Sequence, residues 1–429
     1  MKSEFIVKLN TILAFVISVF FMCVSLFSQS QKVTIRNNAQ EMMLLVDGSP
    51  LMINGMNWDY IPIGMNYSYN FWAQSDSFIE AALHSEMSLL EDMGVNTIRV
   101  YTGIQPKWIT YIHNNYCIYT MLNHSFGRYG MDIDGEWMKN TEYSDPAVRK
   151  LLLIEAKVLV EEFKDTPGLL LFMLGNENNY GLSWGGAETE DIPIAKDEAI
   201  RKRAIAMYKL MNEAVLAMKE IDSNHPVAIC NGDLLYLDLV AEHCKDIDIY
   251  ATNMYRGVSF GDAFSRVKKE LNKPLMFAEF GSDAFNALTD KEDQKMQAYY
   301  MVNNWREIYV NAAGIGGEEN SIGGFTFQFS DGWWKRGQTI DLDIHNKASS
   351  WVSEGYGIDT KDGSNNMNEE WFGICAKGKC NENGLYELFP RAAYYALKEA
   401  HHLNIYNDKF NETDINRYFD NISYSSYDK

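Results

Sequence analysis

Two apolar stretches that end in polar residues constrain this sequence most. Segment 169–179 reads LLLFMLGNENN, so six apolar residues run into a glycine and then into polar side chains that include Glu177. Segment 273–283 reads KPLMFAEFGSD and closes a second apolar run with Glu279. An unbroken apolar run of strand length is typical of a strand that is buried on both faces of a parallel sheet. In a (β/α)8 barrel, the residues at the carboxyl ends of such strands carry the chemistry.

The rest of the chain alternates between strand-like and helix-like patterns around these two stretches. With 429 residues, 46% of them hydrophobic, the chain can build one barrel of ~250 residues with insertions. The predicted strands are 51–58, 96–102, 117–123, 169–174, 225–231, 246–255, 273–279 and 324–330. The predicted helices are 78–93, 106–114, 145–164, 196–221, 234–243, 263–271, 292–313 and 390–401. Eight strands alternating with eight helices predict an α/β fold, a (β/α)8 TIM barrel over residues 51–403.

The two ends of the chain are predicted to lie outside the barrel. Residues 1–30 combine a basic start, an apolar run from Ile12 to Phe27 and small residues after it, which predicts a secretory signal cleaved after Ser30. The protein is then exported, to the periplasm or the extracellular space. An uncleaved anchor is the alternative, because the run approaches membrane-spanning length. Residues 31–50 predict a short β-hairpin that closes the barrel bottom, and residues 404–429 predict a loosely ordered tail.

A loop of more than fifty residues, 331–389, separates the last predicted strand from the last helix. Loops of that length in a compact domain usually serve a function, and this one is expected to fold over the catalytic face. It contains Cys375 and Cys380, which are close enough in sequence to pair in an exported protein. Cys117, Cys230 and Cys244 stand in apolar contexts and are expected to be buried thiols. No cysteine spacing indicates a zinc site.

The charge of the chain limits its partners. A formal net charge of −20 argues against nucleic acid or an anionic membrane as the main partner. It is compatible with a neutral substrate such as a sugar, and the 10 Trp and 25 Tyr include candidates for stacking on sugar rings. Most of these aromatic residues are nevertheless expected to lie in the core.

Glu177 and Glu279 together predict a specific chemistry. Cleavage of a glycosidic bond with retention needs one protonated and one ionised carboxyl group, about 5–5.5 Å apart across the anomeric centre. Glu177 and Glu279 end the fourth and seventh strands, on opposite sides of the barrel mouth, so they can point at each other. Their like charges would raise the pKa of one of them, which supplies the acid. A single strand-end glutamate is more often a helix cap or a surface ion pair, but the matched pair favours catalysis.

Other polar and aromatic residues are candidates for substrate binding. Asn176 lies beside the acid and is expected to contact a sugar hydroxyl, while Tyr255 and Arg99 are expected to orient the nucleophile. Arg99 could instead belong to a structural ion pair. Weaker candidates, for which a place in the core or in a loop is the alternative, are Trp333, Trp334, His124 and Asp59.

The motifs of the second half resemble those of a known family. The segments LGNEN (174–178), NMYRG (253–257), KPLMFAEFGSDA (273–284), GGFTFQFSD (323–331) and PRAAYYALKEA (390–400) are similar to the catalytic barrel of glycoside hydrolase family 2, in the clan of (β/α)8 retaining glycosidases. The resemblance implies that Glu177 is the acid/base, Asn176 its partner, Glu279 the nucleophile and Tyr255 its hydrogen-bonding tyrosine. The segments NGMNWDYIPIG (54–64) and DMGVNTIRVY (92–101) are also similar to family 72 β-1,3-glucanosyltransferases.

These observations predict a retaining β-glycoside hydrolase that acts on a β-linked oligo- or polysaccharide, with β-glucan favoured. The chemistry needs two carboxyl groups and water, so neither a cofactor nor a metal is expected. Two alternatives stay open: a β-glucan transglycosylase that uses the same residues, and a non-catalytic carbohydrate-binding barrel.

Overall fold

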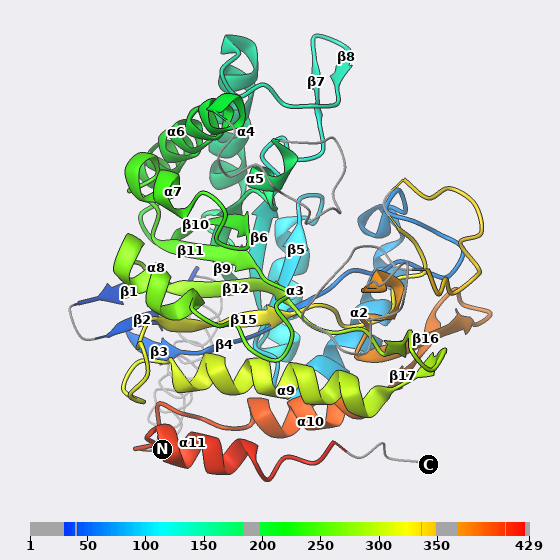
Figure 1. Cartoon of the computed structure of the whole chain (residues 1–429). Coiled ribbons are helices and arrows are strands. Elements are labelled where there is room, and N and C mark those ends of the chain that lie inside the picture. The colour runs from blue at the N-terminus through cyan, green and yellow to red at the C-terminus, as the bar shows by residue number, and fades with distance from the viewer. Residues whose placement is uncertain are drawn as a thin grey trace, which may run out of the picture.

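The computed structural model describes residues 30–38, 41–182, 198–335, 337–348, 367–407 and 409–424. The expected signal segment, 1–30, lies almost wholly outside this part of the chain, as do residues 349–366 in the middle of the long loop. The described residues form a closed barrel of eight strands with helices around it (Figure 1). The fold class predicted from the sequence is therefore confirmed.

The barrel strands follow one another around the barrel in chain order, and each is parallel to both neighbours. They are β4 (Ile53–Asn57), β5 (Thr97–Tyr101), β6 (Tyr119–His124), β9 (Leu169–Leu174), β10 (Val227–Gly232), β11 (Ile249–Asn253), β12 (Leu275–Phe280) and β15 (Ser321–Thr326). Because all eight run in the same direction, their carboxyl ends meet at one mouth, where strand-end side chains from distant parts of the sequence are brought together.

The helices pack outside the strands. They are α2 (Asp76–Met93), α3 (Pro106–Tyr116), α4 (Pro146–Phe163), α5 (Asn178–Gly181), α6 (Glu198–Ile221), α7 (Leu237–His243), α8 (Ala263–Leu271), α9 (Gln294–Val310), α10 (Ala392–His401) and α11 (Glu412–Phe419). The start of α4 shows why the sequence predicts it. Asp145 caps the helix by accepting hydrogen bonds from the N–H groups of Ala147 (2.7 Å) and Val148 (3.2 Å), and Pro146 occupies the first turn.

An antiparallel sheet lies at the amino-terminal side of the barrel, on the left of Figure 1. It contains β1 (Val33–Asn37), β2 (Met42–Val46) and β3 (Ser49–Leu51), with a tight turn at Asp47 and Gly48, both of which have positive φ. Val33, Leu44 and Val46 belong to the same buried cluster as residues of the barrel interior. The expected hairpin is thus part of a three-stranded sheet whose apolar face adjoins the inside of the barrel.

The loop after β15 carries structure that its composition did not predict. Its described part includes a short 3-10 turn, Glu369–Trp371, and the hairpin of β16 (Cys375–Cys380) and β17 (Tyr386–Pro390). Cys375 and Cys380 stand at opposite ends of β16 and are both free, so the expected disulfide is not formed. Cys230 and Cys244 are buried as predicted. Cys117 is exposed, because it ends α3 in a left-handed conformation (φ 54°).

Among the predicted elements, the eighth strand and the carboxyl-terminal tail depart most from the structure, and the sixth strand is shorter than expected, at Ile249–Asn253. The eighth strand begins three residues earlier than expected and ends at Thr326, after which the chain leaves the barrel. Gly323 explains part of this shift: a Cβ there would lie 2.2 Å from the carbonyl oxygen of Ile53, so only glycine lets β15 approach β4. The expected loose tail contains helix α11, whose Asn411 and Asp414 form a capping box. Two further small hairpins, β7 (Met131–Ile133) with β8 (Glu136–Met138) and β13 (Phe285–Asn286) with β14 (Lys291–Glu292), were not predicted.

Candidate active site

The turn after β9 gives Glu177 its position at the barrel mouth. Gly175 (φ 85°) and Glu177 (φ 57°) both have left-handed backbone, which is unusual for a glutamate and is found where the surrounding structure imposes it. Asn178 imposes it from one side, since its Oδ1 accepts the N–H of Asn176 at 2.8 Å. Asn179 does so from the other, since its amide exchanges two hydrogen bonds, both of 2.8 Å, with the backbone of Gly232 on β10. The GNENN motif (175–179) therefore fixes the turn that carries Glu177.

Glu279, the fifth residue of β12, is bound by one cation and one hydroxyl. Nη1 of Arg99, on β5, lies 2.5 Å from Oε1 of Glu279. The hydroxyl of Tyr255, just beyond the end of β11, donates to Oε2 at 3.1 Å. The ring of Tyr255 packs edge-on against Phe327 and Phe372, which fixes the direction of that hydroxyl. One donor on each oxygen fixes the plane of the Glu279 carboxylate.

Arg99 is fully buried and bonded on all sides. Its Nε and Nη2 donate to Oδ1 of Asn123 at 3.0 and 2.7 Å, and Nη1 also donates to Oδ1 of Asn57 at 3.2 Å. Its Nη2 further donates to Oδ1 of Asn176 at 2.8 Å and to the Tyr101 hydroxyl at 3.0 Å. A guanidinium with this many partners cannot swing away from Glu279, so its positive charge is a permanent part of that environment.

Glu177 sits in a different environment from Glu279. Its Oε1 accepts a hydrogen bond from Nδ2 of Asn253, the last residue of β11, at 3.0 Å. Burial, and then the negative charge of Glu279, raise the pKa of Glu177 to about 7, although Arg128 and the Asn253 hydrogen bond act in the opposite direction. A carboxyl group with such a pKa is half protonated near neutral pH and can donate a proton there.

One hydrogen-bond network links the two carboxyl groups. Arg99 contacts both Glu279 and Asn176, and Nδ2 of Asn253 donates both to Glu177 and, at 2.9 Å, to Oδ1 of Asn176. The five residues come from β5, β11, β12 and the turn after β9, so the closed barrel alone brings them together. The structure thus brings these five residues together. Asn176, Glu177, Glu279 and Arg99 were proposed from the sequence, as was Tyr255, which bonds to Glu279 at the edge of the network.

The four weaker candidates lie elsewhere. His124 turns towards α4, where its Nε2 is 3.5 Å from Oε2 of Glu155. The reason is the alternation of a strand: Asn123 points into the barrel towards Arg99, so the next residue points out. Asp59 belongs to a second buried group with Lys377, in which burial raises the pKa of the Asp59 carboxyl and Lys377 opposes that rise.

The two tryptophans of the long loop help to pack that loop. The Trp333 ring stacks on His345 with centroids 4.5 Å apart, and His345 stacks in turn on Trp371 at 3.8 Å. Trp334 lies against Tyr67 with centroids 5.8 Å apart. Trp333 and Trp334 are both half-buried, and these ring contacts are with residues outside the network around Glu177 and Glu279.

Several residues of the site were missed by the sequence analysis. They are Asn57, Asn123 and Asn253 at strand ends, and the tyrosines Tyr101 and Tyr129, whose hydroxyls accept hydrogen bonds from Arg99 and Asn176. The three asparagines share a signal, which is a buried amide at the carboxyl end of a barrel strand. An asparagine is uncommon within a strand, so its presence there indicates a polar task.

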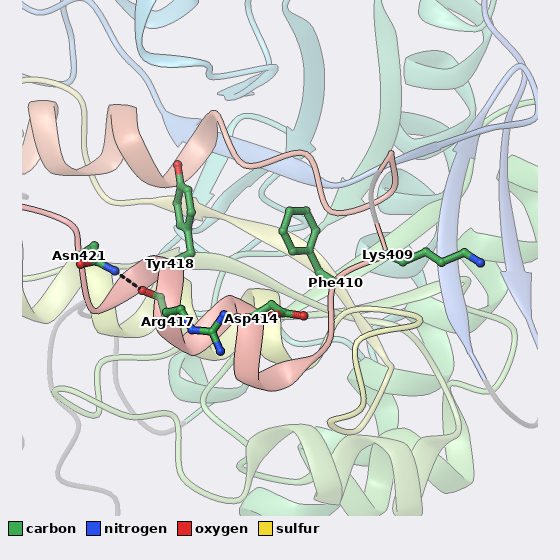
Figure 2. A pocket seen from close by; sticks show the side chains of 6 residues that line it. All are labelled: Lys409, Phe410, Asp414, Arg417, Tyr418 and Asn421. Carbon is green, nitrogen blue, oxygen red and sulfur yellow. Dashed lines mark hydrogen bonds and ion pairs between the residues drawn. The ribbon is translucent and has the colours of Figure 1, made fainter.

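A shallow depression on the surface lies away from this network. Figure 2 shows it on α11, which packs on α9 and is joined to α10 by a hydrogen bond of 2.7 Å from the Tyr418 hydroxyl to the carbonyl oxygen of Glu399. It is lined by Lys409, Phe410, Asp414, Arg417, Tyr418 and Asn421. Arg417 is engaged by Asp414 at 3.6 Å, and Asn421 donates to the carbonyl oxygen of Arg417 at 2.7 Å. This depression contains none of the strand-end residues.

Among the residues that the structure describes, no three His, Cys, Asp or Glu side chains gather closely enough to hold a metal ion. In the same residues, no helix combines the length and the apolar composition needed to cross a membrane.

Comparison with known proteins gives a fold and no family. No protein-family model matches this sequence, and no curated protein matches it. Solved structures do match. A GH2 β-galacturonidase from Eisenbergiella tayi, bound to galacturonate, has a TM-score of 0.52 and 13% identity over 87% of this chain and 54% of its own. A Bacteroides uniformis β-glucuronidase has a TM-score of 0.54 and 13% identity over 87% of this chain and 37% of its own.

A third match is a β-glucuronidase from an uncultured Clostridium sp., with a TM-score of 0.51 and 15% identity over 86% of this chain and 53% of its own. The chain therefore spans about half the length of two of these proteins and little more than a third of the other. At such identities the similarity shows that this chain shares the barrel fold found in these glycosidases.

Proposed function

We propose that this protein is a β-glycoside hydrolase that acts with retention, with Glu279 as nucleophile and Glu177 as acid/base. The observation that carries the proposal is the asymmetry of the two carboxyl groups. Glu279 is bound by the buried Arg99 guanidinium and the Tyr255 hydroxyl, whereas burial and the charge of Glu279 raise the pKa of Glu177 to about 7. Two carboxyl groups whose environments differ in this way divide the roles of base and acid between them.

The first step of the reaction forms a covalent intermediate. An oxygen of Glu279 attacks the anomeric carbon while Glu177 gives its proton to the glycosidic oxygen, so the leaving sugar departs as a neutral alcohol. Arg99 and Tyr255 hold the Glu279 carboxylate in one plane during this attack. The product of the step is a glycosyl ester of Glu279 and an ionised Glu177.

The second step uses the same two residues with their roles exchanged. Esterification removes the negative charge of Glu279, which is the second largest cause of the raised pKa of Glu177. The pKa of Glu177 therefore falls once the intermediate forms, and its carboxylate becomes able to take a proton from the attacking water. Water cleaves the ester from the face opposite Glu279, and the second inversion restores the original configuration.

The substrate class rests on weaker support than the chemistry. The similarity of the first half to family 72 favours a β-glucan, whereas the structural neighbours described above are named as β-glucuronidases and β-galacturonidases. Both groups are β-linked sugars, so we propose a β-linked oligo- or polysaccharide. Transfer to an acceptor sugar uses the same first step and differs only in which hydroxyl attacks the ester.

The test is a panel of aryl β-glycosides and oligosaccharides given to the wild-type protein and to single variants. The panel includes glucoside, galactoside, mannoside, glucuronide and galacturonide. Glu279→Gln should lower kcat/KM at least about 10³-fold on every active substrate, because a neutral amide cannot form the ester. Glu177→Gln should lose activity on poor leaving groups but keep the glycosylation of dinitrophenyl glycosides, which need no proton.

Glu270→Gln, an exposed change on α8, is the matched control and should behave as wild type. Unchanged activity in Glu279→Gln would overturn the assignment, and a wild-type protein that binds but never cleaves would indicate a carbohydrate-binding barrel. Products longer than the substrate would identify a transglycosylase.

A further inference from the structure

We propose that Cys230 is a positioning residue: its buried thiol holds the Asn253 amide in the orientation that supports ionised Glu177. This inference rests on the proposed function, in which Glu177 is the acid/base. Cys230 is the fourth residue of β10, beside β11, and only 1% of its surface is exposed. Cys230 makes two contacts near the acid/base. Its carbonyl oxygen accepts the N–H of Glu177 at 3.2 Å, and its Sγ lies 3.2 Å from Oδ1 of Asn253.

The hydrogen bonds of Asn253 show what the thiol does. Both hydrogens of its Nδ2 are used, one by Oε1 of Glu177 and one by Oδ1 of Asn176. Its Oδ1 must then face a donor, and the S–H of Cys230 is that donor. A carboxamide keeps its shape when it rotates by half a turn, so its orientation is set by which neighbours donate and which accept.

The two orientations of Asn253 favour different states of Glu177. In the observed orientation an N–H points at Glu177, which stabilises the carboxylate. In the rotated one an oxygen would point there, which repels the carboxylate but accepts the proton of the carboxylic acid. The S–H of Cys230 is a better partner for an amide oxygen than for an N–H, so it favours the first orientation, as does Oδ1 of Asn176, which can only accept. Loss of the thiol would leave Oδ1 buried without its donor and let the rotated form be populated.

The thiol stays protonated under the conditions in which the enzyme would work. Burial raises the pKa of Cys230 to about 12, with the nearby Arg99 acting against that rise. The thiol is therefore an S–H donor at neutral pH and not a nucleophile.

Glu177 also faces charged and titratable groups from other elements, all of which a change at Cys230 leaves in place. These groups are Glu279 on β12, Arg99 on β5, Arg128 and Tyr129 after β6, and Tyr255 after β11. A shift in the titration of Glu177 in a Cys230 variant would therefore report on Asn253.

The experiment compares Cys230→Ala, Cys230→Ser, Asn253→Ala and the double variant Cys230→Ala/Asn253→Ala. The readout is the carboxyl ¹³C titration of Glu177 in protein labelled with [5-¹³C]glutamate, assigned by its absence in Glu177→Gln. We expect the pKa of Glu177 to rise by about one unit in Cys230→Ala and in Asn253→Ala, because one hydrogen bond to the carboxylate is lost in each. Cys230→Ser keeps a donor and should titrate much closer to wild type.

The double variant should titrate as Asn253→Ala does, since the thiol acts only through that amide. Cys244→Ala, which removes another buried thiol, is the control and should leave Glu177 unchanged. A wild-type titration in Cys230→Ala, or a further shift when it is added to Asn253→Ala, would overturn the proposal. In an active enzyme the alkaline limb of kcat/KM must move with the titration. A titration that shifts in a protein without glycosidase activity would instead refute the proposed function and keep the positioning role.

Discussion

Asparagine side chains, more than charged ones, define the candidate site. Asn57, Asn123, Asn176 and Asn253 each place an oxygen or an amide against Arg99 or Glu177. A neutral amide can orient an ion without changing the net charge of a buried site. This explains how a fully buried guanidinium and two glutamates coexist at one barrel mouth.

At this scale the sequence predicts the carboxyl groups better than their partners. Glu177 and Glu279 stand out because each interrupts an apolar run at its end. Asn253 carries only the weaker mark of an amide within a strand, and Cys230 carries none, since their roles depend on the strand neighbour that closure of the barrel supplies. His124 shows the opposite error: it ends a strand, but on the outward face.

The Tyr255 hydroxyl gives a prediction for a single atom. Tyr255→Phe removes the donor to Oε2 of Glu279 and keeps the ring against Phe327 and Phe372. We expect kcat/KM to fall roughly 10- to 100-fold, the size of one hydrogen bond to a charged group, with little change in melting temperature. Tyr250→Phe is the matched control, because that hydroxyl donates to the carbonyl oxygen of Asp233 outside the network. Equal effects of the two changes on kcat/KM would contradict the role of Tyr255.

At the scale of elements, apolar periodicity predicts the barrel strands and most helices, and chain closure orders them. The errors fall where local composition is ambiguous. The Gly323–Gly324 pair hides the start of β15, because glycine has low strand propensity although the close approach to β4 requires it. The polar sequence of α11 hides a helix that is stabilised by its capping box and by two fully buried residues, Ile415 and Phe419.

The packing of α11 can be tested separately from catalysis. Phe419 is fully buried against Tyr309 of α9, so Phe419→Ala should lower the free energy of unfolding by about 3 kcal/mol. Denaturant unfolding measures this, and kcat/KM should not change at temperatures where the variant is folded. Asn421→Ala, an exposed change beside the same helix, should cost less than about 0.5 kcal/mol. A loss for Phe419→Ala as small as that of Asn421→Ala would show that α11 is not docked as described.

At the scale of the whole molecule, the barrel has one chemical face and one structural face. The amino-terminal sheet adjoins the interior at one end, and the site and the long loop lie at the other (Figure 1). Beside the barrel, a buried carboxyl group outside the candidate site also titrates near neutrality. Burial raises the pKa of Glu86 to about 7, while Trp58 donates to its Oε2 at 2.5 Å.

Glu86 predicts how stability depends on pH. Its folded pKa lies above its unfolded value of about 4.5, so its contribution is fully present below pH ~4.5 and is lost as pH rises through about 7. Glu86→Gln keeps an acceptor for Trp58 but cannot ionise. The free energy of unfolding should therefore fall between pH 5 and pH 8 by on the order of 3 kcal/mol more in wild type than in Glu86→Gln. Parallel stability curves for the two proteins would contradict the raised pKa.

The central claim is that Glu279 forms a covalent ester which Glu177 then helps to break. The anomer released first, followed by ¹H NMR during the first minutes of hydrolysis of an active aryl β-glycoside, tests it most directly. Two successive inversions predict that the β-anomer appears first and that the α-anomer grows in only by mutarotation. If the α-anomer is released first, the reaction is a single displacement by water, and Glu279 is not the nucleophile.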